Sequence, residues 1–356
     1  MQWHVYCRVV DNFGDIGIAW RLAADLARRG ERVRLAVDDA SALAWMAPRG
    51  AAGVEVVHWS DAPPSVPDVV VEMFGAGIPE AAVSTAAATL RMPIFVNVEH
   101  LSAEAYVERS HGLPSPHAAG DGTMRTTWFF YPGFTRRTGG LLREPGLLER
   151  QHEPGDAAAW LESLGIEARP GERRISVFCY ANGAVAEMLD ALASEPTLLL
   201  LTPGQATAQV AAALGPSLAR GRLRAARLPY LDHGDLDRLL ASCDLNLVRG
   251  EDSLVRAIWA GAPFVWQLYA QDDGAHAAKL DAFLARFRAG ADLALNAMLG
   301  SVFARWNGLA GTPIAATAFE KGPLAAWAGH CTRWRDALAA QADLTTQLLS
   351  FVAAKR

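Results

Sequence analysis

The chain has 356 residues, which at roughly 150 residues per domain predicts two domains. Hydrophobic residues make up 51% and charged residues 20%, a composition that excludes a disordered chain and a coiled coil. The 33 basic and 38 acidic side chains give a net charge of −5, which excludes a protein that coats nucleic acid non-specifically. We therefore expect a globular protein that has no nucleic-acid partner.

The four cysteines are scattered along the chain and form no C-x-x-C pair: Cys7, Cys179, Cys243 and Cys331. We expect buried thiols in a reducing compartment and neither a zinc site nor a redox site. Residues 1–10 lack the charged segment and apolar core of a signal peptide. No stretch reaches the roughly 18 apolar residues that a membrane span requires. These features predict a soluble, cytoplasmic protein with no membrane partner.

The first half begins with a strand at residues 3–10, followed by a Gly-containing loop and a helix. In this helix Ile18, Leu22 and Leu26 recur every four residues, and Gly30 ends it. Further strands are predicted at residues 33–37, 54–57, 69–74 and 94–98, with an alanine-rich helix at residues 80–90. Alternating strands and helices predict a parallel sheet with helices on both faces. Residues 113–155 are rich in Gly, Pro and Arg, which predicts a long loop region and the domain linker.

The second half repeats the alternation. Strands are predicted at residues 175–179, 197–201, 223–228, 245–248 and 264–268, and helices at residues 185–193, 205–214, 236–241 and 254–260. The chain after residue 279 is predicted to be helical, and residues 324–354 are long enough to return to the first half. We therefore expect an α/β protein with domains at residues 1–155, completed by about 335–356, and at residues 156–334.

Ligands of open parallel sheets bind beyond the carboxyl ends of the strands, so two such sheets would border a cleft. The segment DNFGDIG, residues 11–17, follows the first strand, and its carboxylates Asp11 and Asp15 are candidate general bases. The alternative is that Asp15 caps the helix while Gly14 and Gly17 permit the turn. The remaining candidates in the loop are Asn12 and Phe13. The segment lacks G-x-G-x-x-G and its acids would repel a pyrophosphate, which argues against NAD.

A second polar cluster, RGEDS at residues 249–253, follows a predicted strand and opens a helix. The N-terminus of a helix binds anions, so Ser253 and Arg249 are candidate ligands of a diphosphate. Glu251 or Asp252 would instead accept hydrogen bonds from sugar hydroxyls or a base. The alternative is a purely structural cap by Asp252 or Ser253.

Aromatic side chains follow two other strands of the second half. Phe178 and Tyr180 end one strand, and Tyr230 and His233 follow another. Flat rings of this kind stack on a nucleobase, although completing a core is the commoner role of an aromatic residue. The acidic run at residues 232–237 lacks the spacing of a calcium loop and its distal Glu, so we expect no metal.

Four segments carry a family resemblance that spans most of the chain: VVDNFGDIGIAWRLA, SVFCYAN, LPYLDH and CDLNLVRGEDSLVRAIWAGAPFVWQLY. In these segments the chain closely resembles the bacterial protein-arginine rhamnosyltransferases that modify elongation factor P. The resemblance implies two Rossmann-like domains of the GT-B type facing across a cleft. It further implies dTDP-β-L-rhamnose as donor, inversion at the sugar, and an arginine of elongation factor P as acceptor. The acceptor would bind residues 1–155 and the nucleotide sugar residues 156–334, in a monomer that needs no cofactor or metal.

The resemblance also implies roles for individual residues. Asp15 resembles the catalytic base of the family and Asp11 its essential companion. The residues that resemble its donor pocket are Phe178, Tyr180, Tyr230, His233, Arg249, Glu251, Asp252 and Ser253, with Gln267 as a further candidate. In the pattern of the family, Phe stands at the position of Tyr230 and Gln at that of His233. The residue types agree with this chemistry, because inversion needs one base and a stabilised leaving diphosphate.

Two rival interpretations stay open at this point. The first is a GT-B transferase that uses another nucleotide sugar and a small-molecule or lipid acceptor. The second is a non-catalytic two-domain nucleotide-binding or scaffold protein, in which neutralising Asp11 and Asp15 would affect stability alone.

Overall fold

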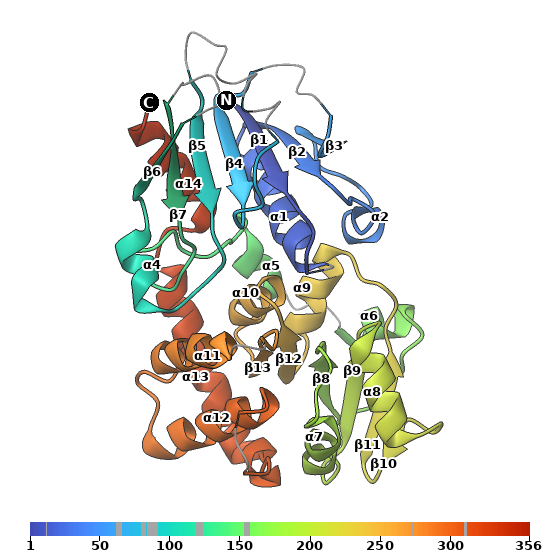
Figure 1. Cartoon of the computed structure of the whole chain (residues 1–356). Helices are drawn as coiled ribbons and strands as arrows, with labels where there is room; N and C mark the ends of the chain where they lie inside the picture. The colour runs from blue at the N-terminus through green and yellow to red at the C-terminus, as the bar shows by residue number, and fades with distance from the viewer. Residues whose placement is uncertain are drawn as a thin grey trace. The chain divides into compact units, whose positions relative to one another are not determined.

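The computed structural model describes residues 1–356 except 12, 62–65, 80–82, 84–91, 119–123, 153–156, 272–273 and 310–311. Asn12 and all but Val83 of the helix expected at residues 80–90 therefore lie outside the described residues. The chain forms two compact units. The N-terminal unit comprises Met1–Pro145 and Leu338–Arg356, and the C-terminal unit comprises Gly146–Ala337 (Figure 1).

The N-terminal unit contains a seven-stranded sheet in the order β3-β2-β1-β4-β5-β7-β6. Its strands are β1 (Gln2–Cys7), β2 (Arg32–Val37), β3 (Val54–His58), β4 (Val69–Met73), β5 (Ile94–Val98), β6 (Pro114–Ala118) and β7 (Met124–Phe130). The first five strands along the chain pair in parallel, as the alternation predicts, and β7 joins them in parallel. Among the described strands of this sheet, only β6 pairs antiparallel, with β7.

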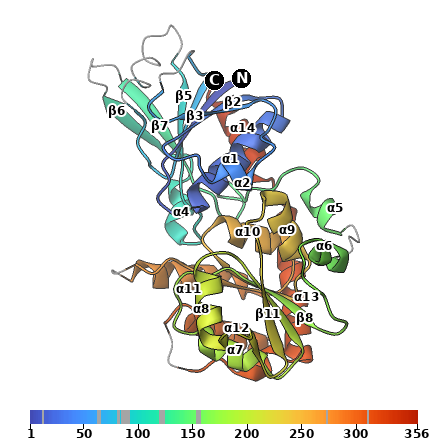
Figure 2. The same ribbon diagram turned by 90° about the vertical axis from the view of Figure 1, so that its right-hand side faces the viewer.

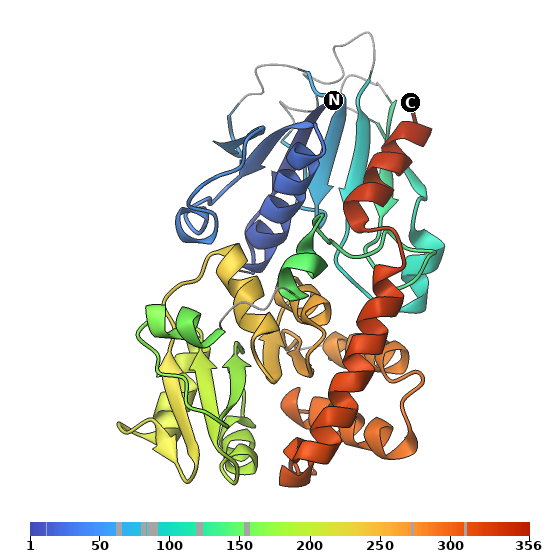
Figure 3. The ribbon, with the colours of Figure 1, turned by 180° about the vertical axis from the view of Figure 1, so that it is seen from behind.

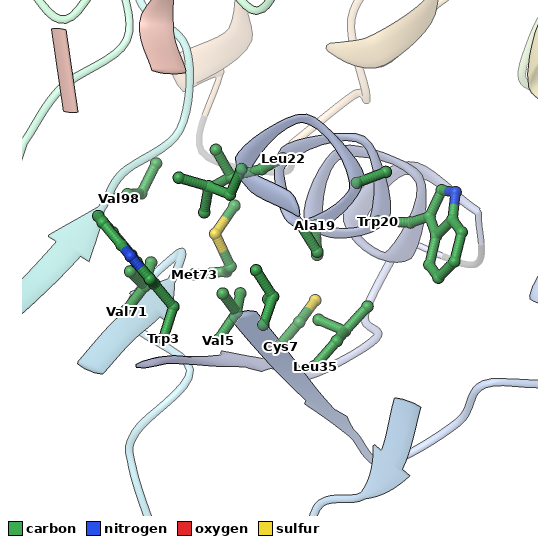
Figure 4. Close-up of a cluster of buried hydrophobic side chains, with 14 of the residues drawn as sticks. Trp3, Val5, Cys7, Ala19, Trp20, Leu22, Leu35, Val71, Met73 and Val98 are labelled. Carbon is green, nitrogen blue, oxygen red and sulfur yellow. The ribbon is translucent and has the colours of Figure 1, made fainter. Parts of the chain in front are cut away.

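Helix α1 (Gly14–Arg28) covers one face of this sheet because its apolar residues form one buried stripe. Ile16, Ala19, Leu22 and Leu26 are all buried, and their side chains pack against β1, β2 and β4. Figure 4 shows this core, with side chains from the helix and the strands pointing toward one another. The start of α1 is thereby fixed just beyond the carboxyl end of β1. The N-terminal unit also contains the short helices α2 (Leu43–Met46) and α4 (Ala105–Ser110).

The C-terminal helix α14 (Leu344–Ala354) returns to the N-terminal unit, as predicted, and lies on the same face as α1 (Figure 3). Leu344, Leu348 and Val352, spaced four residues apart, are buried in the α1 core. The segment 324–354 is nevertheless interrupted, because α13 (Lys321–Ala339) ends and Asp343 caps the start of α14. Arg29, at the end of α1, links α1 to α14, because its guanidinium donates a hydrogen bond to the Asp343 carboxylate at 2.7 Å.

The prediction of a long loop region at residues 113–155 is wrong, whereas the boundary between the two units, at Pro145 and Gly146, does lie within this segment. This segment contains β6, β7 and α5 (Leu147–His152). Strand β6 reads PSPHA and lies at the sheet edge, where proline is tolerated and apolar alternation is not required. An edge strand of this kind gives no periodic apolar signal, which is why composition suggested a loop.

The C-terminal unit contains a six-stranded sheet in the order β10-β11-β9-β8-β12-β13 (Figure 1). Figure 2 shows two of its strands, β8 and β11, in the turned view. Its strands are β8 (Arg173–Val177), β9 (Thr197–Leu201), β10 (Ala219–Arg220), β11 (Leu223–Arg227), β12 (Leu245–Arg249) and β13 (Phe264–Gln267). Its helices besides α5 and most of α13 are α6 (Ala157–Ser163), α7 (Val185–Leu192), α8 (Gln205–Leu214), α9 (His233–Ala241), α10 (Asp252–Ala260), α11 (Ala275–Phe287), α12 (Leu293–Trp306) and the 3-10 helix η1 (Ala316–Phe319). Every predicted strand of this half is present, and the strands from β8 to β13 pair in parallel except for the short β10.

All four cysteines are buried and free, as predicted. Burial raises the pKa of each thiol, that of Cys179 to about 12. Within the described ranges, no helix is both long enough and apolar enough to cross a membrane.

Candidate functional site

Asp15 closes the loop between β1 and α1. It lies in the first turn of α1 and is 8% exposed, and its Oδ2 accepts the backbone N–H groups of Val10 and Asp11, each at 2.9 Å. The N-cap position belongs to Phe13, which makes no side-chain capping hydrogen bond. The alternative that Asp15 caps the helix is therefore wrong, because its carboxylate reaches back into the loop and not forward into α1.

Gly14 brings the Asp11 carboxylate against the start of α1. A Cβ atom at Gly14 would lie 2.7 Å from Asp11 Oδ2, a distance that real Cβ contacts do not show. The Gly14 N–H donates to the Asp11 carbonyl at 2.7 Å, which makes a tight turn. A side chain at residue 14 would therefore force the Asp11 carboxylate to move. The two acids that the sequence singled out are brought together at the carboxyl end of β1.

The environment of Asp15 disfavours its charge. Burial raises the pKa of the Asp15 carboxyl, and the negative charge of Asp11 adds to the rise. The backbone donors at Asp11 and Val10 and the positive charge of His100 oppose it. A carboxyl group whose pKa is raised by burial binds a proton more readily than a solvated one, which suits a general base.

The sequence interpretation missed a group beside this loop, at the carboxyl ends of β4 and β5. Asn97, Glu99 and His100 lie at and just beyond the end of β5, and Phe74 directly follows β4. The same rule that selected Asp11, a polar residue directly after a parallel strand, could have found Glu99 and His100.

The other candidates in the first loop have structural contacts. The Phe13 ring packs edge-on against Trp45, with ring centroids 5.1 Å apart. Gly17 is buried in α1, and its N–H donates to the Phe13 carbonyl at 3.1 Å.

In the C-terminal unit, Arg249 lies between two of the predicted aromatic residues. Its guanidinium carbon is 4.4 Å from the ring centroid of Phe178 and 4.3 Å from that of Tyr180. The residues can meet because β8 and β12 are neighbouring parallel strands, and both end at this edge of the sheet. Buried Gln267, at the end of β13, accepts the Tyr180 N–H at 2.9 Å and donates to the Ala181 carbonyl at 3.2 Å. It therefore orients the backbone that carries Tyr180.

The N-terminus of α10 has no side-chain cap. Glu251 stands at the N-cap position without a capping hydrogen bond, and the Ser253 hydroxyl donates to the Arg249 carbonyl instead. Asp252 and Ser253 lie inside α10 and not at its N-cap position. The first N–H groups of a helix have no partner within the helix itself. Such N–H groups, with the positive end of the helix dipole, attract anions.

Contacts from two further elements fix this turn. The Trp266 indole donates to the Gly250 carbonyl at 2.7 Å, and Gly250 adopts a φ of 63°. Lys279, on α11, forms an ion pair with Glu251 at 2.9 Å. Sequence reasoning missed Lys279, which is 28 residues from its partner. It also missed Tyr269, which is 66% exposed and packs edge-on against Tyr180 at a centroid distance of 5.3 Å.

Tyr230 and His233 follow β11, which is separated from β8 by β9. Tyr230 is 55% exposed. His233 is the first residue of α9. The residue before it, Asp232, caps the helix, and its carboxylate accepts the Asp235 N–H. In the acidic run at residues 232–237, Asp237 pairs with Arg256 at 2.6 Å. The described residues contain no group of three or more His, Cys, Asp or Glu side chains that could hold a metal ion.

Comparison with known proteins identifies the family. The family model for the elongation-factor P (EF-P) rhamnosyltransferase EarP matches residues 3–353. A protein-arginine rhamnosyltransferase of Pseudomonas aeruginosa is 41% identical, over 99% of both chains. A solved structure described as the structural basis for EarP-mediated arginine glycosylation of EF-P is 32% identical, with a TM-score of 0.67 over 100% of this chain and 99% of that one.

More distant structures share the fold alone. The glycosyltransferase SnogD of Streptomyces nogalater is 17% identical, with a TM-score of 0.54 over 99% of this chain and 100% of that one. The fold is therefore that of the GT-B glycosyltransferases, with two Rossmann-like α/β units. The chain belongs to the EF-P rhamnosyltransferase family EarP, and it is an enzyme that transfers rhamnose to arginine in a protein.

Proposed function

We propose that this enzyme transfers L-rhamnose from dTDP-β-L-rhamnose to one arginine of EF-P, with inversion at the anomeric carbon. The name of the family and the solved relative that glycosylates EF-P support this acceptor. Because EF-P is a translation factor, the proposal also places the enzyme in the cytoplasm, where it would act as a monomer. The observation that carries the chemistry is the buried Asp15 carboxylate, held by two N–H groups at a single oxygen.

Asp15 is the proposed general base. Both hydrogen bonds of this carboxylate within the described residues go to Oδ2, and we propose that Oδ1 takes the proton. An arginine guanidinium keeps its proton at neutral pH and its nitrogen lone pairs are delocalised. Asp11 orients the guanidinium, and Asp15 accepts a proton as the nitrogen attacks. Sharing this proton in the transition state is sufficient, so arginine need not be deprotonated beforehand.

The reaction is a single displacement at the anomeric carbon. A bond forms between an arginine nitrogen and that carbon while the bond from the carbon to the diphosphate oxygen breaks. The diphosphate leaves with the electron pair, and the nitrogen gives its proton to Asp15. One displacement inverts the configuration, and the leaving diphosphate needs charge stabilisation rather than a protein acid.

The proposed donor site is in the C-terminal unit. The N-terminus of α10 and the Arg249 guanidinium match the charge of a diphosphate, so we propose no metal or other cofactor. Phe178, Tyr180 and Tyr230 offer rings for the thymine base, with His233 as a neighbouring polar group. Glu251 and Asp252 accept hydrogen bonds from sugar hydroxyls. Because the Ser253 hydroxyl donates to the Arg249 carbonyl, binding phosphate requires that it rotate.

Intact-mass spectrometry tests this proposal. EF-P incubated with the enzyme and dTDP-L-rhamnose should gain the mass of one deoxyhexose, and peptide mapping should place it on one arginine. EF-P with that arginine replaced by lysine should gain nothing. A thermal-shift comparison of dTDP, UDP and GDP separates the rival transferase, since dTDP should stabilise the enzyme most. No mass gain, or a preference for UDP or GDP, would contradict the donor and acceptor proposed here.

A further inference from the structure

Tyr180, which offers its ring to the proposed base pocket, lies in a segment at residues 180–182 that is neither helix nor strand. Backbone polar groups in such a segment have no partners from a helix or a sheet, so side chains or water must satisfy them. Two glutamine side chains hold this segment: Gln267, at the end of β13, and Gln209, in the middle of α8. They are 87 and 29 positions from Tyr180.

The two glutamine amides divide the backbone groups of the segment between them. Gln267 accepts the Tyr180 N–H at 2.9 Å and donates to the Ala181 carbonyl at 3.2 Å. Gln209 donates to the Tyr180 carbonyl at 2.9 Å and accepts the Asn182 N–H at 2.6 Å. The peptide unit between Ala181 and Asn182 is therefore held at its carbonyl by one glutamine and at its N–H by the other. The backbone of Tyr180 is held in the same way, so it cannot turn without breaking a bond to Gln209 or Gln267.

Other contacts fix the two glutamines and the end of the segment. Gln267 is buried. Gln209 also donates to the Gln205 carbonyl, one turn earlier in α8, at 3.1 Å. Asn182 donates to the carbonyl of Trp306, the last residue of α12, at 2.9 Å. A polar network whose members all have partners makes the structure around it rigid.

The held segment places the Tyr180 ring against Arg249. Arg249 is paired with Gln267 in the register of β12 and β13, and its guanidinium carbon lies 4.3 Å from the Tyr180 ring centroid. The ring keeps this contact only while the backbone at residue 180 keeps its position beside the end of β12. A side chain that is already held loses less freedom when a ligand binds, so preorganisation of this kind increases affinity.

We propose that Gln209 and Gln267 are positioning residues for the nucleotide sugar: their amides hold the backbone of Tyr180 so that its ring is in place for the base before the donor binds. This inference rests on the proposed donor site, in which Tyr180 offers its ring to thymine. Both glutamines act through the backbone that carries the ring. Loss of either should therefore weaken donor binding only while the Tyr180 ring is present.

A double-mutant cycle on dTDP binding tests this dependence. Gln209→Met keeps the length and helix propensity of the side chain but removes its hydrogen bonds to the segment, so the Kd for dTDP should rise by about two- to tenfold. In a Tyr180→Ala background the same substitution should change the Kd by less than about twofold. Gln267→Met should behave in the same way, which keeps the test available if Gln209→Met does not fold. Isothermal titration calorimetry measures each Kd, and thermal unfolding measures the Tm of each variant.

Gln347→Met is the matched control. The Gln347 side chain also donates to a backbone carbonyl, that of Ala342 at 2.9 Å, but it lies on α14 of the N-terminal unit. This variant loses a hydrogen bond of the same kind and should keep the wild-type Kd for dTDP.

A purely structural role for the two glutamines makes a different prediction. Gln209→Met would then lower the Tm and leave the Kd unchanged, or it would raise the Kd by the same factor with and without the Tyr180 ring. Either result would overturn the inference. If Tyr180→Ala weakens dTDP binding and Gln209→Met does not, the role of the glutamines alone is refuted. Wild-type affinity in Tyr180→Ala refutes the proposed role of this ring in the donor site and, with it, this inference.

Discussion

The Arg249 guanidinium lies 4.3 Å from the ring centroid of Tyr180, so the cation that would face a diphosphate is fixed by an aromatic residue of the proposed base pocket. Such a contact contributes about 0.5–2 kcal/mol according to its exposure. It couples the two parts of the donor site, because Arg249 cannot move without leaving the ring.

Replacing Arg249 should therefore weaken donor binding. Arg249→Ala should raise the Kd for dTDP by about tenfold or more, since it removes both the stacked ring contact and a charge-assisted hydrogen-bond donor. Arg249→Lys should recover only part of this, because an ammonium lacks the planar fork. Isothermal titration calorimetry measures the Kd, with Arg169→Ala, in an exposed ion pair of the same unit, as the control. An Arg249→Ala enzyme with wild-type affinity would contradict the donor site.

Asp15→Asn should separate activity from stability. Loss of a general base lowers the rate by about 10²–10⁴-fold, and kcat should fall within that range. The fold should be at least as stable, because the Asn oxygen can still accept the two N–H groups while the cost of burying a charge disappears. Thermal unfolding and rhamnosyl transfer, measured on one preparation, test both expectations.

The stability gain of Asp15→Asn should depend on pH. Burial raises the pKa of Asp15 in the folded chain, so the folded state holds this proton more tightly than the unfolded state. Ionisation above the unfolded pKa therefore disfavours the wild-type fold, and Asn cannot ionise. The difference in Tm between variant and wild type should be larger at neutral pH than at about pH 4. A difference that shrinks as the pH rises would contradict the account of Asp15.

Gly14→Ala should displace Asp11 without unfolding α1. A Cβ there would lie 2.7 Å from Asp11 Oδ2, so the carboxylate must move. Alanine gains up to about 1 kcal/mol over glycine in a helix, which offsets the strain. We expect a lower kcat/KM for the acceptor protein and an unchanged Kd for dTDP. Gly322→Ala in α13, where a Cβ would meet open space, is the control and should match wild type. Wild-type acceptor kinetics in Gly14→Ala would argue against a role for Asp11.

Lys279→Met should affect the donor sugar. Lys279 pairs with Glu251 at 2.9 Å, and the side chains are 25% and 14% exposed. Its removal frees Glu251 from a fixed position, so the Kd for dTDP-L-rhamnose should rise more than the Kd for dTDP. Competition titrations compare the two ligands, with Lys321→Met on α13 as the control. Equal changes for both ligands would mean that Glu251 does not contact the sugar.

The second-half sheet could be predicted from sequence because each predicted strand carries apolar residues beside a turn signal, as in the run TLLLL of β9. Strand β9 and helix α8 have the predicted bounds, and each is bounded by a clear turn signal. Edge strand β6 could not be found, because a strand at the sheet edge carries proline and polar residues without a period.

The candidate site also has residues that sequence could select and contacts that it could not. Asp15 lies in the first turn of the helix after β1, and Arg249 ends β12, so their positions relative to predicted strands were enough to select them. The pairing of Lys279 with Glu251 and the stack of His100 on Phe74 depend on which strands and helices are neighbours in space. Those contacts join residues more than 25 positions apart, and a single sequence contains no local pattern for them.

The anomeric configuration of the product tests the central claim most directly. If Asp15 assists one displacement, the β-linked sugar of dTDP-β-L-rhamnose becomes α-linked to the arginine nitrogen. Two-dimensional NMR of the rhamnosylated acceptor measures this configuration. The account predicts an α-linkage alone, and a β-linkage would show two successive displacements or another mechanism that retains configuration, which contradicts it.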